Sequence, residues 1–319
     1  FTTPSSSTDG NCATMNPNTC RPNLMVTDLT GLRDATPHVD EVLWWNENGE
    51  YSQVAPDDFS NRDVRLHSIG VTADGTRTYL AYLGGGFFTL DTSQLAQGAA
   101  DPQVTLLNSP TATPRWANQT VHSSVKIPGK PYVLTTDEIY GTLLNAFTQP
   151  YNTSGCPWGW VHTIDVTDPA HPKTVGQFQL AENKSTYCLS PAGIDPANTT
   201  FTSYASHNPT LTGRIAFVTW HSDGLRAIDL GKVSHPVGAG FYLPSPLNTV
   251  ATEDPALSMG TSKVVMWSYP IIDKGLIYVI DIRNGLYILK YTGVGSAKVN
   301  ALTFLEGNSN LGDAAAIGG

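Results

Sequence analysis

Charged residues are scarce in this sequence, and basic residues are scarcer than acidic ones. Only 14% of the 319 residues are charged, and 27 acidic side chains against 18 Lys and Arg give a formal net charge of -9. Phosphate backbones are bound through clustered basic side chains, so nucleic-acid binding is not expected. No apolar run reaches about eighteen residues, so no membrane span is predicted. No signal peptide precedes Phe1, and we expect that the leader of an exported form has been removed.

Cysteine is rare, and its spacing excludes the common Cys-rich metal and redox motifs. The four cysteines form neither a C-x-x-C pair nor zinc-finger spacing. Local disulfides are the simplest arrangement, because each would pin a polar, irregular segment. The alternative, a reactive thiol, has no neighbouring group that would favour a thiolate. The predicted pairs are Cys12 with Cys20 and Cys156 with Cys188.

Four N-glycosylation sequons fall in loop-like stretches. Together with the predicted disulfides they favour a glycoprotein that is secreted, extracellular or at the cell surface. The acceptor residues are Asn118, Asn152, Asn183 and Asn198.

Familiar catalytic signatures are also missing. The sequence contains no G-x-S-x-G elbow, H-E-x-x-H helix, P-loop or dinucleotide-binding glycine motif. A glycosidase with two carboxylates would draw on Asp137, Glu138, Glu182, Glu253 and Asp254. Exposed tryptophan side chains could stack on sugars or peptides, although tryptophans in strands more often pack between sheets. The candidates are Trp116, Trp158, Trp160, Trp220 and Trp267.

Glycine, proline and short apolar runs are plentiful, which predicts an all-β protein. One pattern recurs four times: a His or Ser, a turn glycine, an apolar strand, a second glycine and a third strand. The first copy reads "HSIGVTADGTRTYLAYLGGGFFTLDT". Most copies are followed by a fourth apolar run. The copies start at His67, His122, His207 and Ser268, and the fourth runs are "PQVTLL", "KTVGQFQL", "HPVGAGFYL" and "KVNALTFLEG".

Four short strands per repeat predict a β-propeller of four-stranded antiparallel blades, with each first strand lining a central channel. An immunoglobulin-type sandwich is the alternative, but it does not require the same motif in each round. Residues 24–45 resemble the outer half of a blade whose inner strands are absent. We therefore expect about five recognisable blades, and up to seven if upstream or partner strands complete the ring. The expected organisation is a polar segment at 1–20, one propeller domain at 21–305 and a tail at 306–319.

The phrase "HTIDVTDPAHPKTVGQF" and its looser echo "RAIDLGKVSHPVGAGF" resemble the LVIVD-repeat family of secreted β-propeller proteins. Other segments, such as "VHSSVKIPGKPYVLTTDE" and "KVVMWSYPIIDKGLIYVIDIRNGLYIL", are similar to actinobacterial members. The resemblance covers roughly residues 65–312 and implies an extracellular propeller without a settled activity.

Three histidines occupy the same place in three repeats, at the start of the innermost strand. In a propeller these positions converge on the channel, so His67, His122 and His207 could meet there, with Glu138 adding a carboxylate. Imidazole is a good ligand for copper, iron or zinc, so a transition metal in the central channel is one reading. The other is that these histidines only bond neighbouring strands. We expect the remaining histidines in turns or on outer strands: His38, His162, His171, His221 and His235.

The sequence as a whole favours an extracellular binding or assembly module that recognises a protein or glycan ligand, or its own copies, through loop surfaces. The alternative is a metal-dependent enzyme, an oxidoreductase with copper, iron or zinc held by the histidines. A second alternative is a structural subunit of an extracellular filament, completed by strands from a neighbour.

Overall fold

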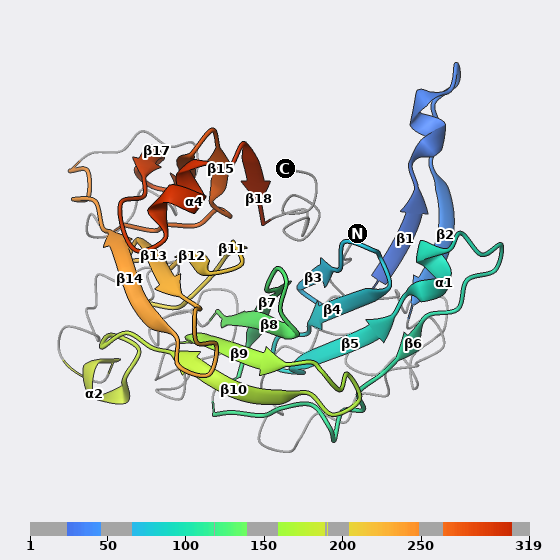
Figure 1. The fold of residues 1–319 in the computed structure, drawn as a ribbon, viewed down its shortest axis with the longest axis horizontal. Coiled ribbons are helices and arrows are strands. Elements are labelled where there is room, and N and C mark those ends of the chain that lie inside the picture. Colours follow the sequence, from blue (N-terminus) through green and yellow to red (C-terminus); the bar gives the residue numbers. More distant parts are fainter. Residues whose placement is uncertain are drawn as a thin grey trace.

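The computed structural model describes residues 24–45, 66–117, 119–138, 159–188, 190, 204–248 and 264–307. Four small four-stranded antiparallel sheets stand around a common axis, which makes the predicted all-β propeller fold with four blades (Figure 1). The expectation of about five blades is met by these four and a two-stranded fragment. The described helices are single short turns at Thr30–Arg33 (η1, 3-10), Ser93–Ala96 (α1), Ser185–Cys188 (α2) and Ser296–Asn300 (α4).

The first three blades follow one plan, in which each strand pairs with the next strand along the chain. The first blade consists of β3 (Ser68–Val71), β4 (Arg77–Ala81), β5 (Phe87–Asp91) and β6 (Thr105–Leu106). The second consists of β7 (Val121–Lys126), β8 (Tyr132–Asp137), β9 (Val161–Asp165) and β10 (Lys173–Phe178). The third consists of β11 (Pro209–Leu211), β12 (Ile215–Thr219), β13 (Leu225–Asp229) and β14 (Val237–Tyr242).

The last blade departs from the sequence prediction. Its strands are β15 (Ile271–Asp273), β16 (Leu276–Asp281), β17 (Gly285–Lys290) and β18 (Phe304–Glu306), in the spatial order β17-β16-β15-β18. The predicted fourth run therefore does not lie outside β17, and part of it forms helix α4 instead. This helix carries the chain back past the β15–β16 turn, where Lys274 and Gly275 donate backbone hydrogen bonds to Thr303 and Leu302. From that point only the free edge of β15 is within reach of the returning strand.

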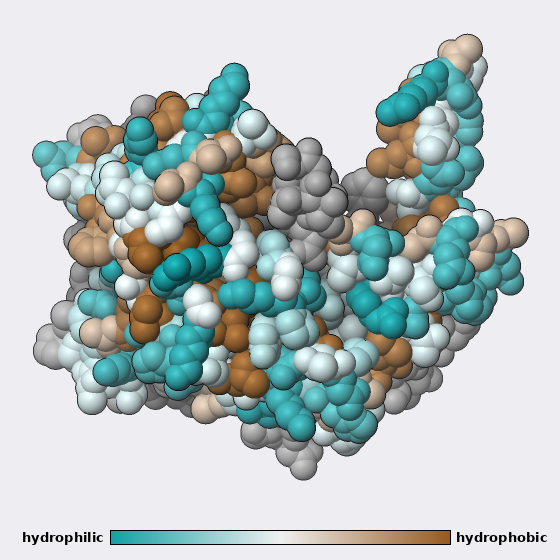
Figure 2. Space-filling view, in the orientation of Figure 1, coloured by the Kyte–Doolittle hydropathy of each residue, from teal (hydrophilic) through white to brown (hydrophobic). Residues whose placement is uncertain are grey.

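The half blade predicted at the N-terminal end is present. Strands β1 (Leu24–Asp28) and β2 (Asp40–Trp45) pair with each other alone and project from the rest of the molecule (Figures 1 and 2). Leu24 and Trp45 are buried against Leu66, Tyr82 and Phe88, so this pair packs on the first complete blade. The described elements leave the ring open between β1–β2 and the last blade (Figure 1).

The hydrophobic core lies between neighbouring blades, where the facing sides of two sheets bury their apolar side chains against each other. Blades two and three share one cluster that includes Ile127, Leu134 and the fully buried Trp220. Blades three and four share another, built around Phe217, Met266 and Val279. A strand whose sheet packs against neighbours on both faces is buried along its whole length. It therefore needs a continuous apolar run, which explains the composition of β12, "IAFVT".

One face of the last sheet remains exposed in the described structure. Its apolar side chains keep 37 to 58% of their surface accessible and belong to Ile271, Ile280, Leu286, Ile288 and Phe304. No helix in the described part of the chain is both long and apolar enough to cross a membrane.

Candidate functional site

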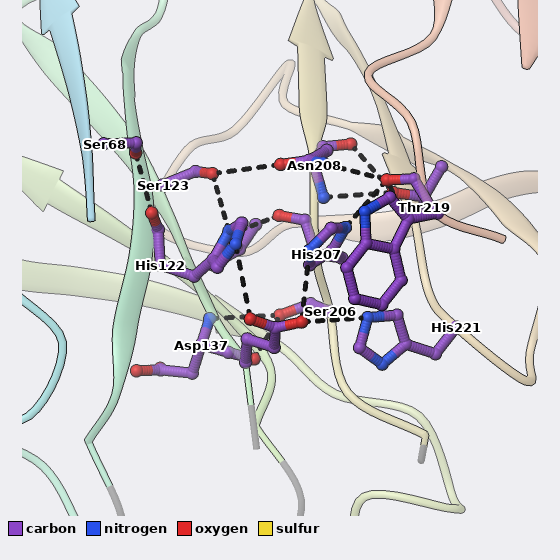
Figure 3. A network of polar contacts seen from close by, with 12 residues as sticks. Ser68, His122, Ser123, Asp137, Ser206, His207, Asn208, Thr219 and His221 are labelled. Carbon is purple, nitrogen blue, oxygen red and sulfur yellow. Dashed lines mark hydrogen bonds and ion pairs between the residues drawn. The ribbon is translucent and has the colours of Figure 1, made fainter. Parts of the chain in front are cut away.

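Five side chains from three blades converge near the axis of the propeller, and we call them the His–Glu cluster. They are His67, His122, Glu138, His207 and His221. All but His67 are buried, with at most 7% of their surface exposed, and His67 marks the side that reaches solvent. In Figure 3 the rings of His122, His207 and His221 turn toward a common point.

Strand register explains why these residues meet. In each of the first three blades, one residue of the first strand pairs with the last or next-to-last residue of the second strand, and the histidine directly precedes that residue. The paired residues are Ser68, Ser123 and Asn208, and the histidines are His67, His122 and His207. Equivalent residues of a radial array point to the same place, so the three imidazoles come from the same point of successive blades.

The other two members come from a second equivalent position. Glu138 lies six residues after Tyr132 in its blade, and His221 lies six residues after Ile215 in the next; both of these strand residues pair with a strand-end aspartate. This position is where the chain leaves the second strand near the axis. His221 takes a backbone φ of +34° there, an uncommon value for a residue other than glycine. Leu83, at the equivalent position of the first blade, takes a φ of +47°, so this conformation belongs to the turn that the blades share.

The carboxylate of Glu138 is the centre of the cluster. Its Oε1 lies 3.1 Å from Nε2 of His207 and 3.3 Å from Nε2 of His221, and its Oε2 lies 3.3 Å from Nε2 of His122. Ring centroids are 3.9 Å apart for His67 and His122, and 4.2 Å apart for His122 and His207. The four imidazoles therefore form a continuous row around one carboxylate.

Hydrogen bonds on the far side of two rings fix which nitrogen faces the carboxylate. Nδ1 of His207 lies 2.7 Å from the backbone oxygen of Trp267, which can only accept, so Nδ1 carries the proton. Asn208 donates its amide to the same oxygen and turns its own oxygen toward Ser123. The Ser123 hydroxyl lies 3.0 Å from Nδ1 of His122 and holds this ring from its outer side.

In both rings Nε2 faces the Glu138 carboxylate, at 3.1 Å for His207 and 3.3 Å for His122. An unprotonated Nε2 in this place directs its lone pair at an anion, a repulsion that a cation between them removes. Oε1 of Glu138 is buried, and among the described residues no donor is aligned to hydrogen-bond it despite the close nitrogens. The arrangement is that of metal ligands: imidazoles held by outer hydrogen bonds, with the inner nitrogens directed at one place.

The electrostatics keep the ligands in the required protonation states. Burial lowers the pKa of His122 well below its ordinary value, the neighbouring His67 lowers it further, and Glu138 opposes the shift only in part. Burial also lowers the pKa of His221. Burial alone would raise the pKa of Glu138, but the nearby His207 and His122 outweigh it and hold that pKa well below its usual value. Glu138 is thus a carboxylate, the form that binds a metal.

The distances fit a transition metal. Two donors bound to one ion at about 2.0 to 2.1 Å are about 2.9 Å apart at a right angle and about 3.3 Å apart at the tetrahedral angle. The three measured nitrogen–oxygen distances, 3.1 to 3.3 Å, lie in this interval. Imidazole nitrogen and carboxylate oxygen together suit copper, iron or zinc.

Aromatic and polar residues close the cluster on its other sides. The indole of Trp267 stacks on the ring of His221, with centroids 5.2 Å apart and planes within 8°, and also contacts His207 at 4.4 Å. The hydroxyl of Tyr269 lies 3.0 Å from that of Ser123, so it supports the residue that orients His122. The rings are therefore held by packing as well as by hydrogen bonds.

Asp137, the neighbour of Glu138, is fully engaged elsewhere. Its carboxylate accepts hydrogen bonds from the Trp116 indole at 2.8 Å and from the Thr120 backbone at 2.6 Å, and it lies 3.1 Å from Nδ1 of His162. The Trp116 ring stacks on His162 with centroids 4.0 Å apart. Asp137 therefore anchors the end of β8, from which Glu138 extends.

Four predicted candidates, His67, His122, His207 and Glu138, thus lie together. His221 was wrongly expected in a solvated turn or on an outer strand, and the signal that identifies it is its register with Glu138. The expectation was wrong for His162 as well, since this residue is 1% exposed inside the second blade. His38 and His171 are exposed, as expected. Ser268, the fourth equivalent of the histidines, accepts a backbone hydrogen bond from Ile280 instead.

The predicted modification sites fare differently. Cys12, Cys20 and Cys156, like Asn118, Asn152 and Asn198, lie outside the described residues, as does the side chain of Cys188. Asn183 is described, and it is wholly buried. Its amide nitrogen donates to the backbone oxygens of Gly159 and Tyr204 at 3.0 and 2.7 Å, which leaves no room for a glycan on this side chain.

The alternative acids and aromatic residues give no second centre in the described structure. Glu182 lies in the polar loop after β10, while Glu253, Asp254 and Trp158 are outside the described residues. Trp220 is fully buried between blades and so cannot bind a sugar. Trp160 donates a hydrogen bond to Gln177.

Asp223, in the turn that carries His221, gives a pH-dependent prediction. Burial raises the pKa of Asp223 to about 7, although Arg226, whose Nη2 lies 3.1 Å from its Oδ1, opposes the shift. The folded protein therefore binds a proton that the unfolded chain has already released above its ordinary pKa of 3.8. Stability must fall as the pH rises through this window, by roughly 4 kcal/mol in total.

Urea unfolding of wild type and Asp223→Asn from pH 4 to pH 8, in EDTA, measures this contribution. We expect the wild-type free energy of unfolding to drop relative to that of the variant as the pH rises. Parallel curves for the two proteins would show that Asp223 ionises normally in the fold.

No family model matches the chain, and no curated protein matches its sequence. The resemblance to LVIVD repeats thus finds no support in a family match. Solved structures give similarity of fold alone, and all three described here are 13% identical to the chain.

The first of them, a periplasmic gluconolactonase of Pseudomonas aeruginosa, has a TM-score of 0.36, with 73% of this chain and 55% of that one covered. A putative 6-phosphogluconolactonase of Bacteroides fragilis has a TM-score of 0.42, with 85% and 63% covered. The Cps50 (Swd1) β-propeller domain of Myceliophteria thermophila has a TM-score of 0.32, with 72% and 58% covered. The chain spans less than two thirds of the length of each.

Proposed function

We propose that this chain is a metal-dependent enzyme, an oxidoreductase, whose centre is the His–Glu cluster. One observation carries the proposal: the Nε2 atoms of three buried histidines surround a single buried carboxylate at 3.1 to 3.3 Å, and the outer hydrogen bond of His207 directs its Nε2 inward. A cation at this place would be bound by these donors, which match copper, iron or zinc.

The surroundings favour redox chemistry over hydrolysis. Metal-dependent hydrolases of the H-E-x-x-H type pair their ion with a separate carboxylate that acts as general base. Here Glu138 is itself directed at the metal position, and Asp137 is engaged by Trp116 and Thr120. The cluster thus offers ligands and aromatic cover without a second free acid among the described neighbours.

Metal analysis of protein purified without chelators tests the proposal. We expect copper or iron in the wild type and a content lower by at least half in His207→Ala. The control is His162→Ala, because His162 is equally buried but lies outside the cluster. Electron paramagnetic resonance during treatment with ascorbate and then ferricyanide should show the bound metal changing oxidation state. Zinc alone would remove the redox assignment, and protein without metal in every preparation would remove the proposal.

A second candidate function is binding or assembly outside the cell, which agrees with the secretion that the sequence predicts. The exposed apolar face of the last sheet supports it, because a contiguous apolar patch on a protein surface is normally covered by a binding partner. Sedimentation of wild type and Leu286→Lys would test self-assembly: a concentration-dependent oligomer lost in the variant supports it, while a monomer at all concentrations opposes it.

A further inference from the structure

We propose that the His–Glu cluster binds two metal ions, bridged by the carboxylate of Glu138. This rests on the proposed function and deepens it, because it states how many ions the centre holds and which residues hold each. The argument comes from how the five donors are distributed in space.

The donors divide into two sets that share only Glu138. One set holds His67, His122 and Glu138, and the other holds Glu138, His207 and His221; within each set all donor atoms lie within 4.8 Å of one another. Donors on opposite sides of one ion are at most about 4.2 Å apart, twice the usual bond length. Each set is therefore of the size that one ion can gather, with a small contraction.

The two oxygens of Glu138 face different sets. Oε2 is the oxygen nearest His122, at 3.3 Å, whereas Oε1 is the oxygen nearest His207 and His221, at 3.1 and 3.3 Å. A carboxylate that serves one ion through each oxygen is a bridge. Ions paired in protein sites stand about 3.5 to 4 Å apart, a separation that such a bridge spans.

The order of the blades leads to the same division. His67 comes from the first blade, Glu138 with His122 from the second, and His207 with His221 from the third. Glu138 thus extends from the middle blade, between an imidazole pair on one side and an imidazole pair on the other. A single ion would leave one pair without a role.

Each ion would have two imidazoles and one carboxylate oxygen from the protein. Two histidines and one carboxylate leave coordination positions open for external ligands, as in oxygen-using iron sites. His67 is the exposed member, so the first ion would lie nearer to solvent. Hydroxide or another small anion entering there would supply the negative charge that one carboxylate does not.

Metal content per folded chain distinguishes this proposal from the one on which it rests. Full-length protein is loaded with Cu²⁺, desalted and analysed by native mass spectrometry and elemental analysis. We expect two ions per chain. One ion would leave the proposed function intact and overturn the bridge, and no ion would overturn both.

Single-ligand variants locate the ions. His67→Ala and His221→Ala should each retain one copper, whereas the control His162→Ala should retain two. A centre with one ion would hold a single copper in the wild type, so the loss of one copper from two in each variant would not be seen.

The spectrum of the copper-loaded protein provides a readout that does not depend on folding of variants. Two bridged Cu²⁺ ions couple magnetically, so the wild-type signal should integrate to well under the copper present. His221→Ala should give the full signal of one isolated ion. A wild-type signal equal to its total copper would contradict a bridged pair.

Discussion

Glu138→Gln is expected to remove the metal from the whole cluster. Glutamine keeps the size of glutamate but has no charge, and its amide nitrogen cannot bind a metal as a carboxylate oxygen does. Because Glu138 belongs to both donor sets, both should fail together, and metal content should fall at least tenfold. Elemental analysis of the desalted variant measures this.

The same variant predicts a change in stability. A ligand present at about a thousand times its dissociation constant stabilises the fold by about 4 kcal/mol. EDTA should therefore lower the wild-type free energy of unfolding by an amount of this order, and it should have no effect on Glu138→Gln. Glu182→Gln is the control, since this acid lies in the loop after β10 and outside the cluster. Retention of metal by Glu138→Gln would contradict the central role of this carboxylate.

Trp220→Ala is expected to cost about 4 kcal/mol in the free energy of unfolding. The Trp220 side chain is fully buried between the second and third blades, where it packs edge-on against Phe178. Its indole nitrogen also donates to the Tyr204 backbone oxygen at 2.8 Å, so the substitution leaves a cavity and removes one of the two hydrogen bonds to that oxygen, which Asn183 also contacts. Since His221 is the next residue, metal affinity should weaken as well.

Urea unfolding of three proteins checks this expectation. Trp220→Phe should fall between wild type and Trp220→Ala, because it keeps most of the ring and loses the hydrogen bond. Phe241→Ala, which removes a side chain that is 71% exposed, should change stability by less than about 0.5 kcal/mol. A loss below about 1 kcal/mol in Trp220→Ala would mean that the interface between these blades does not hold the fold together.

Local sequence predicted the blades well, since alternating turn glycines and apolar runs leave few other structures for a chain of this composition. It placed the first three strands of all four blades and the isolated pair β1–β2. It was wrong for β18, whose residues are apolar enough for a strand at either edge. The choice of edge depended on helix α4, which returns the chain to the β15–β16 turn.

The candidate site, like the last blade, was predictable from local sequence only in part. The position shared by His67, His122 and His207 could be read from the repeat, because it depends only on counting within each copy. Counting within the repeats also shows that Glu138 and His221 share a second position. Whether this second position lies near the three histidines depends on where the second strand ends relative to the axis. The hydrogen bonds that direct each ring come from Trp267, Asn208 and Ser123, which are far apart in the sequence.

The sequence by itself thus determined the repeating strand pattern and the histidines that recur with it, because strand and turn formation depend on neighbouring residues. Only the tertiary structure decided which imidazoles face the Glu138 carboxylate, in which tautomer, and which edge of β15 receives the last strand. These depend on contacts between blades, and such contacts are set by packing around the axis.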